Sequence, residues 1–396
     1  MPGSKARSAT PVAIDMRLAF NATSLLGPLT GLGQYSFHLA SELLGREDIS
    51  VDLFYGAFWA SKLYTPQSPK LTAALPWLRD QIPYSYELRR WLQNLRFYGH
   101  THRTRLKNKF DAYHEPNIVP LRFDGPTVIT VHDLSWIRHP ETHPVVRVRA
   151  MNRYFEKGLQ QADAIIVDSS FVKQELMDVF GTASDSISVI PLGVDPLFRP
   201  LESTQTTATL TKYQLQHGKY FVAVGTLEPR KNLSLAITAY LQLPQRIRRL
   251  HPLVLIGMKG WHSASLEQKL GALIDAGEVR ELGYIPRPEL ALLMAGALAL
   301  VYPSVYEGFG LPPLESMACG VPAICANASS LPELVGDAGV LVDPHNDSDL
   351  VAAYLRMIED QQWRSELADR ASLRADQYTW SGCADRTLAV YRSVVT

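Results

Sequence analysis

The sequence predicts an α/β protein with two doubly wound domains, each a parallel sheet covered by helices on both faces. Short apolar, β-branched runs alternate with amphipathic stretches along most of the chain, which is the order typical of such folds. The apolar runs are continuous instead of alternating, as expected for strands buried on both faces. At 396 residues the chain is long enough for two cores, so we expect a cleft between two domains.

Two series of predicted strands define these domains. The first comprises 12–15, 51–56, 127–133, 164–170 and 187–193, and the second comprises 220–226, 253–257, 279–285, 298–304, 321–326 and 339–344. Between them, prolines and a glycine in GVDPLFRPLEST interrupt the pattern and predict a linker. The predicted boundaries are a flexible tail over 1–11, a first domain over 12–195, a linker over 196–210, a second domain over 211–378 and a helix over 379–396 that returns to the first domain.

Composition excludes several classes of protein. Lys+Arg and Asp+Glu both number 39, so no net charge attracts nucleic acid. The three cysteines, Cys319, Cys325 and Cys383, form no CxxC pair, which argues against a disulfide framework or a zinc site. The sequence shows no signal peptide and no apolar stretch of membrane-spanning length. We therefore expect a cytoplasmic protein.

Ligands of open parallel sheets bind beyond the carboxyl ends of the strands, so the loops at these ends are the candidate sites. In GPLTGLGQ, Gly31 and Gly33 precede a predicted helix, where backbone N–H groups can approach a phosphate. A plain tight turn is the alternative, because no third glycine completes the dinucleotide fingerprint.

Arg230 and Lys231 follow a buried strand of the second domain and open a helix. Two adjacent cations can neutralise a diphosphate. Cations at a helix N-terminus are unfavourable unless an anion joins them, which favours a bound anion over a solvated helix start.

The segment YPSVYEGFGLPPLESMACG, residues 302–320, combines a strand end, a glycine-rich loop and a helix start. Glu315 falls in the first helical turn, where a carboxylate can accept hydrogen bonds from a ribose diol, and Glu307 lies on the loop. The alternative is that Glu315 only complements the helix dipole and that Glu307 is solvated. Free N–H groups are expected at Phe309, Gly310 and Leu311.

Glu307 and Glu315, with seven residues between them, resemble the EX7E motif of the family 4 glycosyltransferases, which are retaining enzymes of the GT-B fold. GTLEPRKNL, GYIPRPEL and PELVGDAGVLVDP resemble the donor-domain blocks of that family in the same order, and VIPLGVDPLFRP resembles its linker. The resemblance covers nearly the whole chain. It implies two Rossmann-like domains that face a cleft, with a C-terminal helix that crosses back to the N-terminal domain.

The resemblance also implies roles for the residues of the second domain. Arg230 and Lys231 would bind the donor diphosphate. Glu315 would bind the ribose hydroxyls, and Glu307 would contact the transferred sugar. Further donor contacts are implied for the main chain at Tyr284 and Ile285, beside the base, and at Phe309, Gly310 and Leu311.

In the first domain, Gly31 and Gly33 match the glycine loop of the family near the diphosphate, although this chain reads GLG where many members read GG. His132 matches the cleft histidine beside the anomeric carbon; a purely structural histidine is the alternative. His114 and Glu115 form a similar strand-end pair, expected toward the acceptor.

The implied reaction keeps the anomeric configuration, with the leaving phosphate helping to deprotonate the acceptor hydroxyl. The positive charges of Arg230 and Lys231 would make a metal unnecessary, so no cofactor is expected besides the nucleotide-sugar substrate. The DxD sequence Asp347-Ser348-Asp349 opens a polar helix after a proline and is predicted to be a helix cap.

Residues 131–171 resemble bacterial mannosyltransferases that use GDP-mannose to build O-antigen or exopolysaccharide. Residues 85–110 hold seven Lys/Arg and one acid among aromatic side chains, a composition typical of a membrane-surface helix or of an ordinary helix packed by its aromatic face. With membrane contact, the acceptor is expected to be a saccharide linked to polyprenyl diphosphate, at the inner face of the membrane.

Three alternatives remain open. The first is a transferase of the same family that uses a UDP- or ADP-sugar to move glucose or GlcNAc; sucrose-type transferases, which prefer UDP- or ADP-glucose, belong to this group. Sugar-nucleotide epimerases share the two-domain fold but lack the block around Glu307 and Glu315. A non-catalytic nucleotide-binding scaffold is disfavoured because Arg230, Lys231 and both glutamates are present.

Overall fold

The computed structural model describes residues 16–27, 29–64, 85–104, 109–258 and 264–395. By its internal contacts the chain divides into two compact units. The first unit comprises Met1–Thr130, Lys157–Ile166 and Ala384–Thr396, and the second comprises Val131–Glu156 and Val167–Cys383. No helix of the described residues is long and apolar enough to span a bilayer.

The first sheet has seven strands in the order β3-β2-β1-β4-β5-β6-β7. These are β1 (Met16–Asn21), β2 (Ile49–Phe54), β3 (Trp59–Ala60), β4 (Ala112–Glu115), β5 (Thr127–Val131), β6 (Ala164–Val167) and β7 (Ile187–Val189). β1 pairs in parallel with β2 and β4, with Leu18 opposite Val51 and Ala112, whereas the short edge strand β3 is antiparallel to β2.

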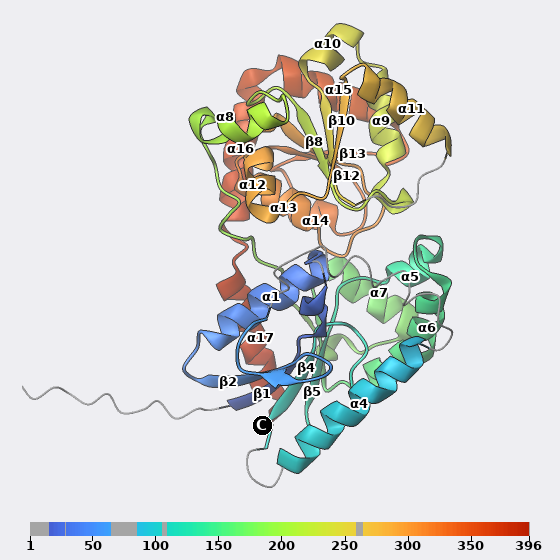
Figure 1. The fold of residues 1–396 in the computed structure, drawn as a ribbon, viewed down its shortest axis with the longest axis vertical. Helices are drawn as coiled ribbons and strands as arrows, with labels where there is room; N and C mark the ends of the chain where they lie inside the picture. Colours follow the sequence, from blue (N-terminus) through green and yellow to red (C-terminus); the bar gives the residue numbers. More distant parts are fainter. Residues whose placement is uncertain (1–15, 28, 65–84, 105–108, 259–263, 396) are drawn as a thin grey trace, which may run out of the picture. The chain divides into compact units, whose positions relative to one another are not determined.

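Helices cover both faces of this sheet (Figure 1). They are α1 (Gly31–Leu44), α4 (Ser85–Thr104), α5 (Ser135–Arg138), α6 (Val145–Gln161), α7 (Ser170–Phe180) and the C-terminal α17 (Trp380–Val395). Phe97 of α4 is buried against Phe54 and Tyr113. His114 points to the other face, where its ring nitrogens lie 2.8 Å from Thr130 Oγ1 and 2.6 Å from the hydroxyl of Tyr391 on α17. The C-terminal helix therefore packs on the N-terminal sheet.

The second sheet has six strands in the order β10-β9-β8-β11-β12-β13. They are β8 (Phe221–Val224), β9 (Leu253–Ile256), β10 (Val279–Gly283), β11 (Ala299–Tyr302), β12 (Ala323–Ala326) and β13 (Val340–Val342). This is the 3-2-1-4-5-6 order of dinucleotide-binding folds, whose direction of winding reverses between β8 and β11. A ligand site is expected where the loops after these two strands meet.

Alternate residues of the second sheet enter two separate cores. Phe221 and Ala223 pack with α9 (Leu233–Leu241) and α15 (Asp347–Glu359), whereas Tyr220 and Val222 pack with α8 (Ser203–Lys212) and α12 (Arg287–Ala295). The remaining helices are α10 (Gln245–Leu250), α11 (Ala264–Asp275), α13 (Leu311–Ala318), α14 (Leu331–Val335) and α16 (Gln361–Ala375). Burial on both faces explains the continuous apolar runs of these strands.

The strand Met16–Asn21 was not expected, because Arg17 interrupts its apolar pattern; in the sheet the charge of Arg17 is neutralised by Asp52 at 2.6 Å. The strand expected over 12–15 lies outside the described residues. Helix α8 covers the second half of the expected linker 196–210 and starts from a capping box made by Glu202 and Gln205. His114 and Glu115, expected as a strand-end pair, are the last two residues of β4.

Tyr391→Phe is expected to lower the free energy of unfolding by about 1–3 kcal/mol, because it removes the hydroxyl that pairs with the fully buried His114. Chemical denaturation followed by circular dichroism measures the change. Tyr64→Phe is the matched control, since Tyr64 is 54% exposed. Equal stability of the two variants would contradict this role of Tyr391.

Candidate active site

The candidate site lies at the carboxyl ends of β8 and β11, where the second sheet reverses its winding. Gly225 follows β8, and the chain runs on to a 3-10 turn, Pro229–Lys231, whose end is marked by Asn232 in the left-handed conformation. The loop after β11 carries Glu307. The two loops are joined directly, since Val305 N donates to Arg230 O at 3.0 Å.

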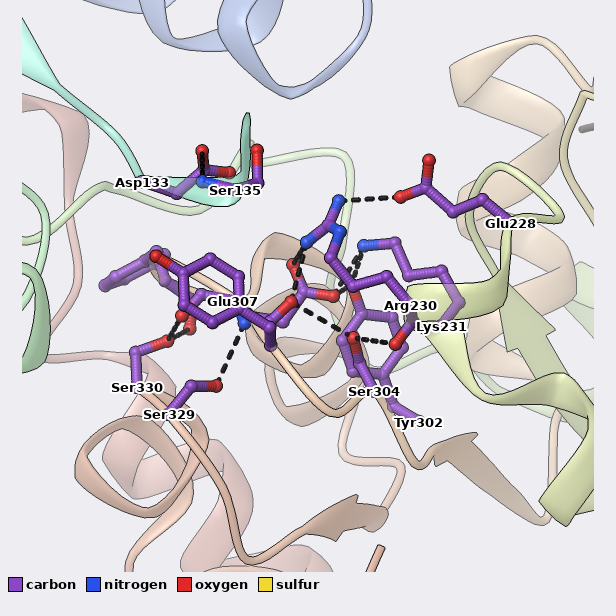
Figure 2. A network of polar contacts seen from close by, with 12 residues as sticks. Asp133, Ser135, Glu228, Arg230, Lys231, Tyr302, Ser304, Glu307, Ser329 and Ser330 are labelled. Carbon is purple, nitrogen blue, oxygen red and sulfur yellow. Dashed lines mark hydrogen bonds and ion pairs between the residues drawn. The ribbon is translucent and has the colours of Figure 1, made fainter. Parts of the chain in front are cut away.

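Glu307 is the centre of a buried polar network (Figure 2). Its Oε1 lies 2.5 Å from Lys231 Nζ and accepts the hydroxyl of Tyr302 at 2.8 Å. Its Oε2 accepts Arg230 Nη1 at 3.3 Å. Burial alone would raise the pKa of Glu307, but the positive charges of Lys231 and Arg230 outweigh it and hold the pKa at about 2. Glu307 is therefore ionised at every physiological pH.

Arg230 is held from several sides. Its Nη2 donates to Glu228 at 2.7 Å and its Nη1 donates to the carbonyl of Tyr306 at 2.6 Å. Burial opposes the charged form, yet the carboxylates of Glu307 and Glu228 raise the pKa of Arg230 above its ordinary value. Arg230 Nε is buried and has no hydrogen-bond partner among the described residues.

Two carboxylates balance the two cations. The sequence argument required an anion beside Arg230 and Lys231, and the structure supplies Glu228 and Glu307 in that role. The protein's own carboxylates therefore offset the unfavourable placement of two cations before a helix. The presence of these cations by itself gives no evidence of a bound diphosphate. A small pocket beside Lys231 is lined in part by Gly225, Tyr302 and other residues at the strand ends.

Only part of the glycine-rich loop offers free amides. Gly310 has φ +114°, and a Cβ there would come within 2.9 Å of Leu331, so the turn requires glycine. Helix α13 starts at Leu311, and Pro312 and Pro313 remove the next two N–H groups of its first turn. No hydrogen bond from the N–H of Phe309, Gly310 or Leu311 is found within the described residues. These three amides are the donors available at this helix start.

Glu315 lies on α13 and is 4% exposed. Its Oε1 is 2.9 Å from Arg287 Nη2, and Arg287 Nε lies 3.2 Å from Asp195 Oδ2. The ring of Phe198 lies beneath the guanidinium, 4.8 Å away. Glu315 is therefore not a solvated dipole partner but a carboxylate oriented by a fixed cation.

His132 follows β5 and approaches the Glu307 loop through the backbone. A Cβ on Gly308 would lie 1.7 Å from the carbonyl oxygen of His132, so only glycine permits this approach. Ser169 Oγ donates to the carbonyl of Gly308 at 2.6 Å. The imidazole Nδ1 of His132 lies 2.6 Å from Asp168. The structure thus brings His132 to the segment that carries Glu307.

Tyr284 and Ile285, the two residues predicted to contact the base, follow β10 and differ in exposure. Gly283 has φ +67°, and the next residue, Tyr284, is 52% exposed. Ile285 is buried in the core of the second sheet with 8% exposure. Their main-chain contact with a base stays a prediction.

The predicted site residues of the first unit are the two glycines of α1 and the pair His114 and Glu115 of β4. Gly31 is the first residue of α1 and has open space at its Cβ position, whereas a Cβ on Gly33 would meet Leu29 at 3.1 Å. His114 and Glu115 are 0% and 1% exposed. Because both are hydrogen-bonded inside the fold, as by Asn21 to Glu115 at 2.6 Å, they support structure and do not face an acceptor.

The DxD sequence is a helix start, as expected. Asn346 accepts Ser348 N and caps α15, and Asp347 and Asp349 lie in its first turn. Within the described part of the chain, no group of three His, Cys, Asp or Glu side chains is arranged to hold a metal.

Sequence reasoning missed four contributors: Glu228, Arg287, Tyr302 and Asp168. Each acts by holding a predicted residue: Glu228 holds Arg230, Arg287 holds Glu315, Tyr302 holds Glu307 and Asp168 holds His132. Their places at strand ends were visible for Tyr302 and Asp168. Arg287 and Asp168 lie far in sequence from the residues they hold, so no local pattern identifies them. Glu228 and Tyr302 lie two and five residues from theirs, but no spacing rule pairs them.

Comparison with known proteins identifies the class. Residues 29–197 match the family described as Glycosyltransferase Family 4, and residues 211–375 match Glycosyl transferases group 1. Sucrose-phosphate synthase from Thermosynechococcus elongatus has the same fold, with a TM-score of 0.71 at 21% identity over 96% of this chain and 98% of that one. The protein is a glycosyltransferase of the GT-B fold.

Two relatives in Escherichia coli narrow the family. The chain is 36% identical over 391 residues to O-antigen chain mannosyltransferase B, covering 95% of this chain and 100% of that protein. It is 30% identical over 267 residues to the serotype-specific mannosyltransferase WbdA, covering 65% of this chain and 32% of that protein. The chain belongs to the family 4 glycosyltransferases.

Glu307→Gln is expected to lower the free energy of unfolding by about 3–5 kcal/mol, because two mostly buried cations lose their carboxylate. Denaturant unfolding of both proteins measures the difference at several pH values. Since the pKa of Glu307 is depressed to about 2, the difference should hold above pH 4.5 and shrink as the pH falls toward 2.

Glu289→Gln is the control for this experiment. Glu289 pairs with the exposed Lys212 at 2.6 Å, so its loss should change stability far less. A Glu307→Gln effect no larger than that of the control would contradict the importance of the buried network.

Proposed function

We propose that this glycosyltransferase moves an α-mannosyl residue from GDP-mannose to a saccharide acceptor in the synthesis of a cell-surface polysaccharide. The observation that carries the proposal is the site at the winding reversal of the second sheet, where the buried Glu307 pairs with Arg230 and Lys231. The buried Glu315 on α13, paired with Arg287, is the second carboxylate of the motif. The mannosyl and O-antigen assignment is supported by the full-length likeness to O-antigen chain mannosyltransferase B.

In the proposed reaction the donor diphosphate binds Arg230, Lys231 and the amides of the Gly310 loop. These groups stabilise the negative charge that develops on the departing phosphate, and they are held in place before the substrate arrives. Diphosphate binding would take Lys231 and Arg230 partly from Glu307, which turns its carboxylate toward the transferred sugar. Retention follows if the acceptor attacks from the face that the phosphate leaves.

No metal or other cofactor is proposed, because the two cations supply the charge that a metal ion provides in other phosphate sites. Glu315, oriented by Arg287, would bind the ribose diol, and the chain at Tyr284 and Ile285 would contact the base. Gly31 has an open Cβ position, and a diphosphate contact at Gly31 stays an expectation from the family resemblance.

Donor preference is the point at which the alternatives differ. A UDP- or ADP-sugar enzyme of the same family would keep the same charged residues. A non-catalytic scaffold would bind a nucleotide without transferring or hydrolysing the sugar.

The acceptor is proposed to be linked to a lipid, and the enzyme to work in the cytoplasm at the inner face of the membrane. Helix α4 supports this. Leu88, Trp91 and Leu95 are 59%, 58% and 57% exposed and recur at positions that form one stripe of a helix. Arg89, Arg96 and Arg103, also exposed, recur at seven-residue intervals along the adjoining stripe.

The described residues of α4 that are buried, Phe97 and Thr101, lie on its opposite side, where Phe97 enters the core. The helix therefore already has its packing face, and the apolar stripe is not needed for it. A stripe of large apolar side chains beside a row of arginines is complementary to a bilayer that contains anionic lipid.

Calorimetric titration with GDP, UDP and ADP tests the donor site. GDP is expected to bind most tightly, and Lys231→Ala and Glu315→Ala should each weaken it about tenfold to hundredfold by removing a charged hydrogen bond. Lys212→Ala, on the exposed end of α8, is the control and should bind as the wild type does. Preference for UDP would overturn the mannosyl assignment, and absence of nucleotide binding would overturn the proposed donor site.

Sedimentation with vesicles tests the membrane surface. The protein should bind vesicles that contain phosphatidylglycerol better than vesicles of phosphatidylcholine alone, and less strongly at high salt. Trp91→Ser should reduce binding severalfold, whereas Leu373→Ser, at a 69% exposed position of α16, should not. Equal binding of the two variants would exclude α4 as the contact.

A further inference from the structure

One buried carboxylate has no part in the donor network described above. Asp168 is the first residue after β6, and His132 is the first residue after β5, its neighbour in the sheet. Asp168 is 2% exposed, and its Oδ2 lies 2.6 Å from His132 Nδ1. The imidazole is 19% exposed at the side-chain level, so the pair has one buried and one accessible member.

Asp168 serves no other visible purpose. The adjacent helix α7 is capped by Ser169, which accepts Val172 N, and so does not need this carboxylate. Asp168 Oδ1 is buried and lacks a hydrogen-bond partner among the described residues. Burial raises the pKa of Asp168, His132 opposes that rise, and Asp133 adds to it. A carboxylate buried at this cost with a single partner indicates that the partner is the reason for its presence.

The position of His132 is fixed by the backbone as well. Gly308 packs against its carbonyl oxygen, and Ser169 binds the carbonyl of Gly308 at 2.6 Å. Backbone contacts set the place of the residue but not the tautomer or the orientation of its ring. Asp168, 2.6 Å from Nδ1, can set both.

We propose that Asp168 is a positioning residue that accepts the Nδ1–H of His132 and thereby presents the lone pair of Nε2 as an acceptor to a hydroxyl of the transferred hexose. The inference rests on the proposed function for the identity of the ligand. Asp168 acts through His132 and does not touch the sugar.

Nitrogen NMR of protein labelled with ¹⁵N-histidine tests the arrangement without any substrate. In the wild type at a pH where the ring is neutral, the His132 signals should show a proton on Nδ1 and none on Nε2. The His132→Gln variant assigns these signals by their loss. In Asp168→Asn the Nδ1 preference should disappear. Wild-type signals with the proton on Nε2 would overturn the proposal even if the variant failed to fold.

Kinetics of sugar transfer supply the second readout. Asp168→Asn is expected to lower kcat about tenfold to hundredfold while the donor KM changes less than about twofold. The reason is that the variant removes the hydrogen-bond partner that orients His132, whereas His132 itself contacts the sugar. In the double variant with His132→Gln, the Asp168→Asn change should add nothing further. Additive losses would mean that Asp168 acts independently of His132 and would overturn the proposal.

Asp163→Asn is the matched control. Asp163 lies at the opposite end of the same strand and its Oδ2 accepts Thr127 N at 2.8 Å, so it also joins β6 to β5. This variant should keep kcat and the His132 signals. An equal loss of kcat in both variants would mean that Asp168 only stabilises the pairing of β5 and β6, and would overturn the proposal. If the wild type transferred no hexose, the proposed function would fail, while the NMR result would still decide the role of Asp168.

Discussion

Glu307 is an ionised carboxylate buried between two cations, and the geometry of the site depends on this interaction. Its bonds to Lys231 and Arg230 tie the loop after β11 to the loop after β8. Ser304 adds a bond to the carbonyl of Arg230. Since neither cation could stay buried alone, the carboxylate is a structural requirement before it is a catalytic one. In the proposed reaction, a diphosphate would take over part of the neutralisation of Lys231 and Arg230 that Glu307 provides in the free protein.

The second constraint is the close approach of two backbones. Gly308 lies against the carbonyl of His132, and the absence of a side chain at this position allows the contact. The residue beside Gly308 is Glu307, so a backbone contact places the histidine near the charged network. Glycine matters here for space, whereas Gly310 matters for its positive φ. The segment 307–310 therefore requires glycine at two positions for two different physical reasons.

Much of the fold followed from the apolar pattern alone, because strands buried on both faces give continuous runs. The strands of the second sheet were expected within a few residues of their places, and alternate residues such as Phe221 and Val222 enter opposite cores. The strand β1 was not expected because Arg17 breaks the apolar pattern, and the charge of Arg17 is neutralised by Asp52 only when the sheet forms. Helix α8 was not expected either, although Glu202 and Gln205 form a capping box at its start.

The sequence by itself determined the fold class, the family and the residues that carry charge, because these depend on local patterns and on motifs of contiguous residues. It pointed to Arg230, Lys231, Glu307, Glu315 and His132 without their partners. Only the tertiary structure decided that Glu228 and Glu307 neutralise the cations, that Arg287 orients Glu315, and that His114 is structural. These outcomes depend on which strand ends become neighbours, a long-range property that folding sets and that no local spacing records.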